Sequence, residues 1–312
     1  MSRATYVLWR LAQIVPTVLL IGVIVFLLTR FLPGGPIAAL LGDKASDEAI
    51  ARITAQYGFD QPIPVQFAKF VNLALHGDLG DSIAYRMPAA RLIAERLPVT
   101  LTLTGMAIAI ALILATPLAY AAAVHQNRWP DLVIRGAFQV GLSSPIFYVG
   151  LLLLTALAAG LRLFPVGGYG DTIGEKFYHL VLPALTLALS LSAIVMRSLR
   201  ASIIAVMKAD FVQFARAKGL PPAIVFRRHV MRNAAISTVT IIGLHAGDLL
   251  GGAVVTETVF AVPGVGRLMV DSIFARDYPV IQALTLTLAV IVSLVFLITD
   301  LLQMTLDPRI GR

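Results

Sequence analysis

The chain has 312 residues, of which 58% are hydrophobic and only 13% are charged. Soluble domains average about 25% charged residues, so this composition excludes a soluble globular protein and indicates an integral membrane protein. The chain contains no cysteine, which excludes disulfides and thiolate metal sites. Its net charge of +8 can be interpreted only once the charged residues are located relative to the predicted spans.

Six segments are apolar over roughly the 20 residues that a membrane-spanning helix needs. We expect each of them to form one span. They cover approximately residues 8–30, 99–124, 133–161, 179–196, 236–255 and 280–304. The first segment is too long for the core of a signal peptide and has no clear cleavage site, so we predict that it is a retained anchor.

The basic residues concentrate on one side of these spans. Segment 197–235 alone carries eight Lys or Arg residues and a single acidic residue, Asp210. Because basic loops stay in the cytoplasm, this segment and both termini are predicted to be cytoplasmic. The positive charge therefore reports topology and does not indicate a nucleic-acid partner.

The chain divides accordingly into three parts. Residues 1–32 form a tail and the first span, residues 33–98 an extracytoplasmic segment, and residues 99–312 a core of five further spans with a cytoplasmic loop at 197–235. The extracytoplasmic segment has helical spacing at 47–57 and 64–75 and a turn at 77–82. It is too small for a core of its own, so we expect a compact cap on the outer face.

The second, third and fourth spans contain proline, at Pro117, Pro145 and Pro183 respectively. A proline frees a backbone carbonyl, which is tolerated where a neighbouring helix or a wet cavity satisfies it. A kink that serves packing alone is the simpler interpretation for each of them.

A short helix is predicted within the cytoplasmic loop, over residues 211–218. Asp210 and Gln213 have the spacing of a capping box at its start. Gly219 and the pair Pro221–Pro222 would end it. Two helical turns are marginally stable in water, so this helix needs a contact with something else.

The faces of this short helix suggest what that contact is. Phe211, Phe214 and Ala215 fall on one stripe, roughly opposite Gln213 and Arg216. The stripe fits a groove on another protein, and packing on neighbouring parts of the same chain is the alternative.

The fifth span carries Gly243, Gly247 and Gly251 at four-residue spacing, a pattern that lets another helix approach closely. His245 and Asp248 lie on the opposite side. Ionisable groups at membrane depth usually face a cavity or a partner, so these two are candidates for lining a pathway. A structural hydrogen bond between them is the competing interpretation, and a proton relay lacks a second cluster of acids.

A stretch rich in glycine and proline, residues 257–266, follows the fifth span and leads into an amphipathic piece at 267–276. We expect this stretch to turn back towards the membrane surface, and a simple outer hairpin is the alternative.

No nucleotide-binding P-loop, HExxH or GxSxG motif occurs, and no set of clustered carboxylates. The sequence therefore offers no catalytic or metal-binding residues. A transporter of this kind that is driven by a nucleotide has to use a separate hydrolase.

Several long motifs carry a resemblance to a known family. They are LPGGPIAALLG, YGFDQPIPVQF and HGDLGDS near the outer segment, DFVQFARAKGL and RHVMRNA in the cytoplasmic loop, and GGAVVTETVFAVPGVGRLMVDSIFARDYPV and DLLQMTLDPRI towards the end. Through them the chain resembles, nearly end to end, the permease subunits of bacterial dipeptide and oligopeptide ABC importers, a family that includes nickel and glutathione importers.

The resemblance implies an all-α integral membrane protein of the bacterial inner membrane, with six transmembrane helices in the type I ABC importer permease fold. The family's coupling helix, which contacts the ATPase, corresponds to Asp210, Phe211, Phe214, Ala215, Arg216, Ala217, Lys218 and Gly219. Two positions depart from the family pattern: Ser237 stands where relatives usually have proline, and Gly35 replaces a common aspartate.

The implied partners are a second, homologous permease, two ATPase subunits that bind ATP and Mg²⁺, and an extracytoplasmic substrate-binding protein. No cofactor is implied for this chain itself. The leading function is ATP-driven import of di- or oligopeptides. Import of nickel chelates or glutathione-like compounds, an autonomous ion-coupled transporter and a membrane scaffold without transport are the alternatives.

Overall fold

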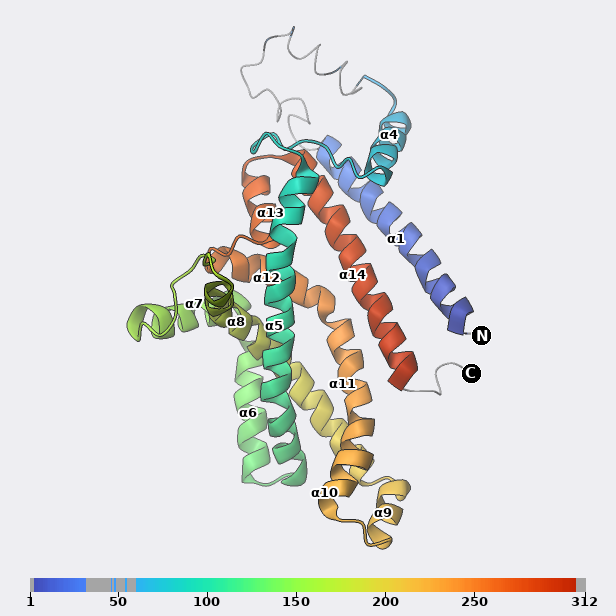
Figure 1. Ribbon diagram of the computed structural model, residues 1–312, viewed down its shortest axis with the longest axis vertical. Coiled ribbons are helices and arrows are strands. Elements are labelled where there is room, and N and C mark those ends of the chain that lie inside the picture. The colour runs from blue at the N-terminus through green and yellow to red at the C-terminus, as the bar shows by residue number, and fades with distance from the viewer. Residues whose placement is uncertain (1–2, 32–45, 47, 49–53, 55–59, 307–312) are drawn as a thin grey trace.

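The computed structural model describes residues 3–31, 46, 48, 54 and 60–306, and this part of the chain is helical and contains no β-strand. The elements are α1 (Arg3–Phe31), α4 (Ile63–Leu75), α5 (Ala89–Val124), α6 (Trp129–Ser143), α7 (Ile146–Leu153), η1 (Leu154–Gly160), α8 (Ile173–Met207), α9 (Asp210–Ala217), α10 (Pro222–Ile224), η2 (Val225–Met231), α11 (Arg232–Leu244), α12 (Ala246–Val259), α13 (Val265–Phe274) and α14 (Tyr278–Leu306). Figure 1 shows an elongated bundle with α9 and α10 at one end and α4 and α13 towards the other.

The membrane spans are of two kinds. Four continuous helices, α1, α5, α8 and α14, are long and apolar enough to cross a bilayer. Two bent pairs of helices are long and apolar enough only when taken together: α6 with α7 and η1, and the helical stretch from α10 to α11 with α12. The all-α architecture is confirmed, whereas a single helix over the third and over the fifth predicted segment is wrong.

The first break has a clear chemical cause. The axes before and after it differ by 105°. Ser144 at the break is extended, with φ −87° and ψ 133°, and a residue that precedes a proline avoids the helical conformation. Pro117 and Pro183 lie inside the continuous helices α5 and α8. Of the three prolines, only Pro145 therefore redirects the chain.

The core of the bundle is the contact between α5 and α8, the most extensive in the described chain. Ala107, Ala111, Ala115 and Ala119 recur every four residues along α5 and are fully buried. Small side chains at this spacing let two helices approach closely in a membrane. This alanine stripe, which we did not predict, places α8 at the centre of the molecule.

At the end opposite α9, α4 packs on the first span. The ring of Phe26 lies 5.3 Å from that of Phe67 and 5.7 Å from that of Phe70. The predicted helix at 64–75 is confirmed as α4. The predicted helix at 47–57 and the position of Gly35 lie almost entirely outside the described residues.

Two buried carboxylates bind distant parts of the chain together at this end. Asp277 accepts hydrogen bonds from the Ser82 hydroxyl and from the backbone N–H groups of Ile83 (3.2 Å) and Ala84 (3.1 Å), which joins the predicted turn to the start of α14. Glu257 accepts hydrogen bonds from Thr100 Oγ1 on α5 (2.5 Å) and from the backbone N–H of Arg267 (3.0 Å).

The stretch from α12 into α13 folds closely around the side chain of Glu257, and two of its glycines have no room for a side chain. A Cβ on Gly264 would lie 2.2 Å from the carboxyl carbon of Glu257, and one on Gly266 would lie 2.5 Å from Cα of Val254. Only glycine fits at these two positions. The chain therefore turns back, and α13 packs against α5, α12 and α14 instead of standing away as a simple hairpin.

Candidate functional site

The short helix predicted in the basic loop is present as α9. Its start differs from the prediction, because the residue before the first helical turn is Ala209 and no side chain caps the helix there. Asp210 is the first helical residue, and the side-chain amide of Gln213 donates to the carbonyl of Met207 (3.2 Å). The predicted capping box is therefore wrong.

The end of α9 is defined by Gly219. Its φ of +77° lies in the left-handed region, which favours glycine. The N–H of Gly219 donates to the carbonyl of Arg216 (2.9 Å) and the N–H of Leu220 donates to that of Ala215 (3.3 Å), the pair of bonds that defines a Schellman motif. The predicted stop at this glycine is confirmed.

The faces of α9 divide differently from the predicted stripe. Val212 and Ala215 are buried against the chain's own core, whereas Phe211 is 47% exposed and Phe214 is 63% exposed. The ammonium group of Lys218 lies 4.6 Å from the centre of the Phe214 ring, which orients that ring. The helix thus rests on its own chain through two small side chains and presents two phenylalanines outward.

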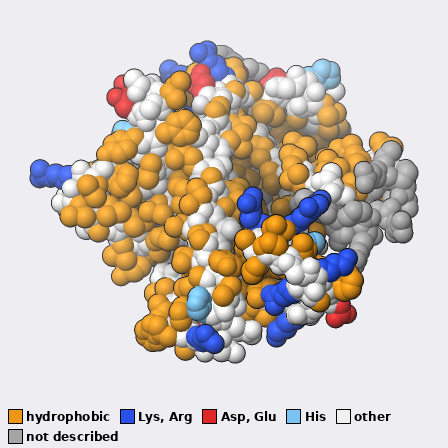
Figure 2. Space-filling view, turned by 60° about the horizontal axis from the view of Figure 1, so that its bottom comes forward, with side chains coloured by type: hydrophobic (Ala, Val, Ile, Leu, Met, Phe, Trp, Pro, Cys, Tyr) orange, Lys and Arg blue, Asp and Glu red, His pale blue; other side chains and the backbone are white. Residues whose placement is uncertain are grey.

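The surroundings of α9 are basic. Figure 2 turns this end of the molecule towards the reader and shows Lys and Arg side chains gathered there among hydrophobic ones. On the far side of the loop, the Phe226 ring in η2 packs on the Tyr120 ring in α5, with 4.3 Å between ring centres. The loop is therefore fastened to the bundle on the C-terminal side of α9.

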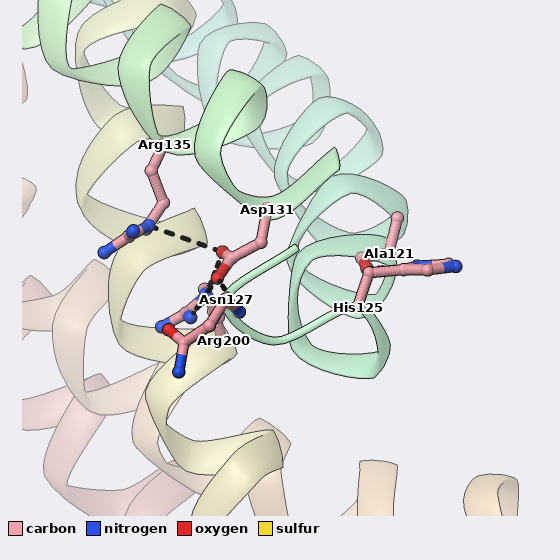
Figure 3. Close-up of polar contacts among 6 residues, drawn as sticks. All are labelled: Ala121, His125, Asn127, Asp131, Arg135 and Arg200. Carbon is pink, nitrogen blue, oxygen red and sulfur yellow. Dashed lines mark hydrogen bonds and ion pairs between the residues drawn. The ribbon is translucent and has the colours of Figure 1, made fainter. Parts of the chain in front are cut away.

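The base of α8 is fixed by a buried ion pair (Figure 3). Asp131, in the first turn of α6, is fully buried. It accepts hydrogen bonds from Nε (2.7 Å) and Nη2 (2.6 Å) of Arg200 and from the backbone N–H of Asn127 (2.8 Å). Arg135 lies 3.4 Å away on the same helix. The pair locks α8, which leads into α9, to the turn between α5 and α6.

Sequence reasoning missed this ion pair. Asp131 and Arg200 are 69 positions apart, and only the packing of α6 on α8 brings them together. A lone acidic residue in an otherwise basic loop region was the available signal.

His245 and Asp248 lie where the fifth span bends by 55°. Their side chains are hydrogen-bonded, with 2.7 Å between His245 Nδ1 and an Asp248 oxygen. The Asp248 side chain is 77% exposed and the His245 side chain 30% exposed. The two groups therefore pair with each other and also face outward from this chain.

The three glycines of the fifth span have different surroundings. A Cβ on Gly243 would lie 2.0 Å from Thr299 of α14, and one on Gly247 would lie 3.8 Å from Val292 of the same helix. Gly251 has nothing within 4 Å. The bend at His245 interrupts the stripe, so close packing on α14 is limited to the Gly243 end.

The described chain is a helical membrane bundle with a short surface helix in a basic loop. The fold agrees with two solved structures. The methionine ABC transporter MetNI in an inward-facing form has a TM-score of 0.59 and 13% identity, and the match covers 69% of this chain and 96% of that one. An amino acid ABC transporter with histidines has a TM-score of 0.51 and 20% identity, and the match covers 70% of this chain and 94% of that one.

Sequence comparison goes further. Residues 115–312 match the family described as the inner membrane component of binding-protein-dependent transport systems, and residues 3–104 match the N-terminal part of such components. The glutathione transport system permease protein GsiC of Salmonella choleraesuis (strain SC-B67) is 40% identical over 305 residues, which is 98% of both chains. The same permease from Escherichia coli (strain K12) is 39% identical over the same share.

The chain belongs to the family of inner-membrane components of binding-protein-dependent transport systems. It is a permease subunit of an ABC importer, a multi-pass protein of the inner membrane that works with an ATPase and a substrate-binding protein. It is not the subunit that hydrolyses the nucleotide.

Proposed function

We propose that this permease takes up peptides, and that α9 is the point at which the ATPase drives it. The supporting observation is that Phe211 and Phe214 are exposed on a helix that is otherwise anchored to its own chain. Large aromatic side chains that protrude from a rigid base are typical anchors of protein interfaces. The contact would comprise Asp210, Phe211, Phe214, Arg216, Ala217, Lys218 and Gly219. Ala215, which was expected in the same contact, instead faces the chain's own core.

The way in which α9 is connected supports a mechanical role. It follows α8 after two residues, and α8 is tied to α6 through Asp131 and Arg200. On its other side, α10 and η2 lead into α11 and the bent fifth span. A displacement of α9 would therefore act on both helical stretches at once, as rigid-body alternating access requires.

Phe214→Ala tests the docking surface. Removing an interface anchor costs about 2 kcal/mol or more, so we expect the ATPase to bind about 30-fold more weakly to the purified permease complex and ATP-linked uptake to fall with it. Phe177→Ala is the matched control, because Phe177 is 50% exposed on the opposite end of α8. Undiminished uptake and ATPase affinity in Phe214→Ala would contradict the assignment.

For the cargo, the relatives favour one peptide in particular. The permeases that are 39–40% identical over 98% of the chain are named for glutathione, itself a tripeptide. We therefore propose glutathione or similar short peptides, with nickel chelates as the alternative. Calorimetric titration of the associated binding protein with glutathione, a dipeptide series and a nickel chelate would decide, and tight binding of the nickel chelate alone would overturn the peptide proposal.

We also propose that Asp248 and His245 line the pathway. The carboxylate of Asp248 is 77% exposed in an apolar span, and such a group needs water or a partner at membrane depth. Asp248→Asn should change the rate of uptake without loss of complex assembly. Normal uptake would leave the hydrogen bond to His245 as its structural role.

The remaining parts of the proposal concern assembly. A second, homologous permease would complete the pathway, and two ATPase subunits would bind ATP and Mg²⁺. Both termini would be cytoplasmic. Figure 1 supports this, because the first residues of α1 and the last residues of α14 point towards the end of the bundle that carries α9. Cross-linking and subunit counting in the purified complex would test the stoichiometry.

A further inference from the structure

A pocket in the line of contact between α6 and α8 has no part in the functions above. We call it the seam pocket. Its volume is about 370 Å³. The lining side chains of each helix recur at helical spacing, so α6 forms one wall of the pocket and α8 forms the other. The walls include Leu132, Arg135 and Gln139 from α6 and Met196, Arg197 and Arg200 from α8.

The seam pocket is strongly positive. Three guanidinium groups line it, and two of them, those of Arg135 and Arg200, are paired with one carboxylate, that of Asp131. Arg200 takes up that carboxylate with two hydrogen bonds, while Arg135 reaches it only at 3.4 Å. No carboxylate of the described residues lies within 4.0 Å of the Arg197 guanidinium. Three arginines and one carboxylate therefore leave a net charge of +2 at the seam pocket.

Figure 3 shows how the arginines are arranged. Arg135 and Arg200 approach Asp131 from different helices, and the outer nitrogens of Arg135 point away from the carboxylate. The Arg135 side chain is 46% exposed. A second anion can thus meet guanidinium donors here without displacing the ion pair that locks α8.

The surface beside the seam pocket is apolar. On α6, Leu132 is 51% exposed and Val140 is 69% exposed. Trp129 is the first residue of the same helix and is 76% exposed. Exposed tryptophan marks the boundary between headgroups and hydrocarbon in membrane proteins. The pocket therefore lies near the level of lipid headgroups, beside a surface of α6 that is suited to acyl chains.

We propose that the seam pocket binds the phosphate group of an anionic phospholipid. Guanidinium groups match phosphate in geometry and charge, and basic pockets between transmembrane helices are suited to acidic headgroups. A free phosphate ion would satisfy the same arginines, but it leaves the exposed apolar surface beside the pocket unexplained. The bound lipid would sit against the helix that leads into α9 and would stiffen it.

The test uses the purified permease complex in neutral detergent, titrated with phosphatidylglycerol, and measures lipid retained by native mass spectrometry. One basic side chain near an anionic surface contributes about a fivefold change in affinity. We therefore expect Arg197→Gln and Arg135→Gln each to weaken retention about fivefold and the double variant about 25-fold. Arg128→Gln is the matched control, because this exposed arginine precedes α6 and does not line the pocket.

A second variant separates shape from charge. Gly136 lines the seam pocket, and a Cβ there would meet nothing within 4 Å. Gly136→Leu fills the pocket, keeps every arginine and favours the helix, so it should fold and lose the lipid. Retention that is unchanged in this variant and in the double arginine variant would overturn the proposal.

Two further experiments test whether something other than a lipid occupies the seam pocket. Inorganic phosphate at millimolar concentration should not compete with phosphatidylglycerol, and full competition would assign the site to a free anion instead. Because the chain has no cysteine, Gln139→Cys provides a single labelling site. Its efficient cross-linking to another protein subunit would show that a protein covers the pocket and would overturn the lipid assignment. A failed coupling role for α9 would leave this inference unaffected.

Discussion

At the scale of single residues, a buried ion pair between Asp131 of α6 and Arg200 of α8 fixes the position of one helix relative to the other. Asp131 is fully buried and joined to Arg200 by two short hydrogen bonds. Burying two charges is costly, and removing one partner leaves the other uncompensated. This makes the pair a strong constraint on geometry rather than a large net source of stability.

Asp131→Asn should therefore destabilise the protein by about 3 kcal/mol, because Arg200 loses its buried counter-ion. Thermal unfolding of the purified complex would measure the loss. Glu95→Gln is the control: its ion pair with Arg91 is well exposed, and such pairs contribute about 1 kcal/mol at most. Equal effects of the two changes would contradict the structural role of Asp131.

Gly219→Ala tests a backbone constraint alone. The new Cβ would meet no atom within 4 Å, but the φ of +77° would cost about 1–2 kcal/mol for alanine. We expect faster hydrogen exchange in α9 and weaker ATP-linked uptake. Gly105→Ala offers the comparison, because it is equally uncrowded and lies within a regular helix, where alanine stabilises by about 1 kcal/mol.

At the scale of elements, the contact between α5 and α8 depends on small side chains. Ala111 is fully buried in that contact, whereas Ala109, two positions away, is exposed. Ala111→Leu should force the helices apart at a cost of about 1–3 kcal/mol or more, while Ala109→Leu should be nearly neutral. Thermal stability and yield of the assembled complex would show the difference, and a neutral Ala111→Leu would argue against a close contact.

The broken spans show what local sequence can and cannot reveal about elements. Pro145 explains the first break, because it restricts the residue before it and cannot donate a backbone hydrogen bond. No proline accompanies the break at His245, and the glycines nearby predict a straight packing stripe. The direction taken by α12 depends on its contacts with α7 and α8, which lie far away in the sequence, and with α13, which follows it after a short loop.

At the scale of the whole molecule, charge predicts which end faces the cytoplasm. The chain has no cysteine, so introduced cysteines give clean labels. A cysteine at Gln213 should react with a membrane-impermeant maleimide only in inside-out vesicles. A cysteine at Asp60 should react only in right-side-out vesicles. The reverse pattern would contradict the positive-inside assignment and, with it, the docking role of α9.

Local sequence patterns are sufficient to predict the membrane class, the six apolar segments, α4, α9 and the glycine that ends α9. Each depends on composition or on residues a few positions apart, where hydrophobic periodicity and backbone preference act directly. The folded chain was needed to establish which face of α9 is buried, where the fifth span bends, and that Asp131 meets Arg200. These depend on the packing of helices that are distant in the chain, and no local propensity encodes such contacts.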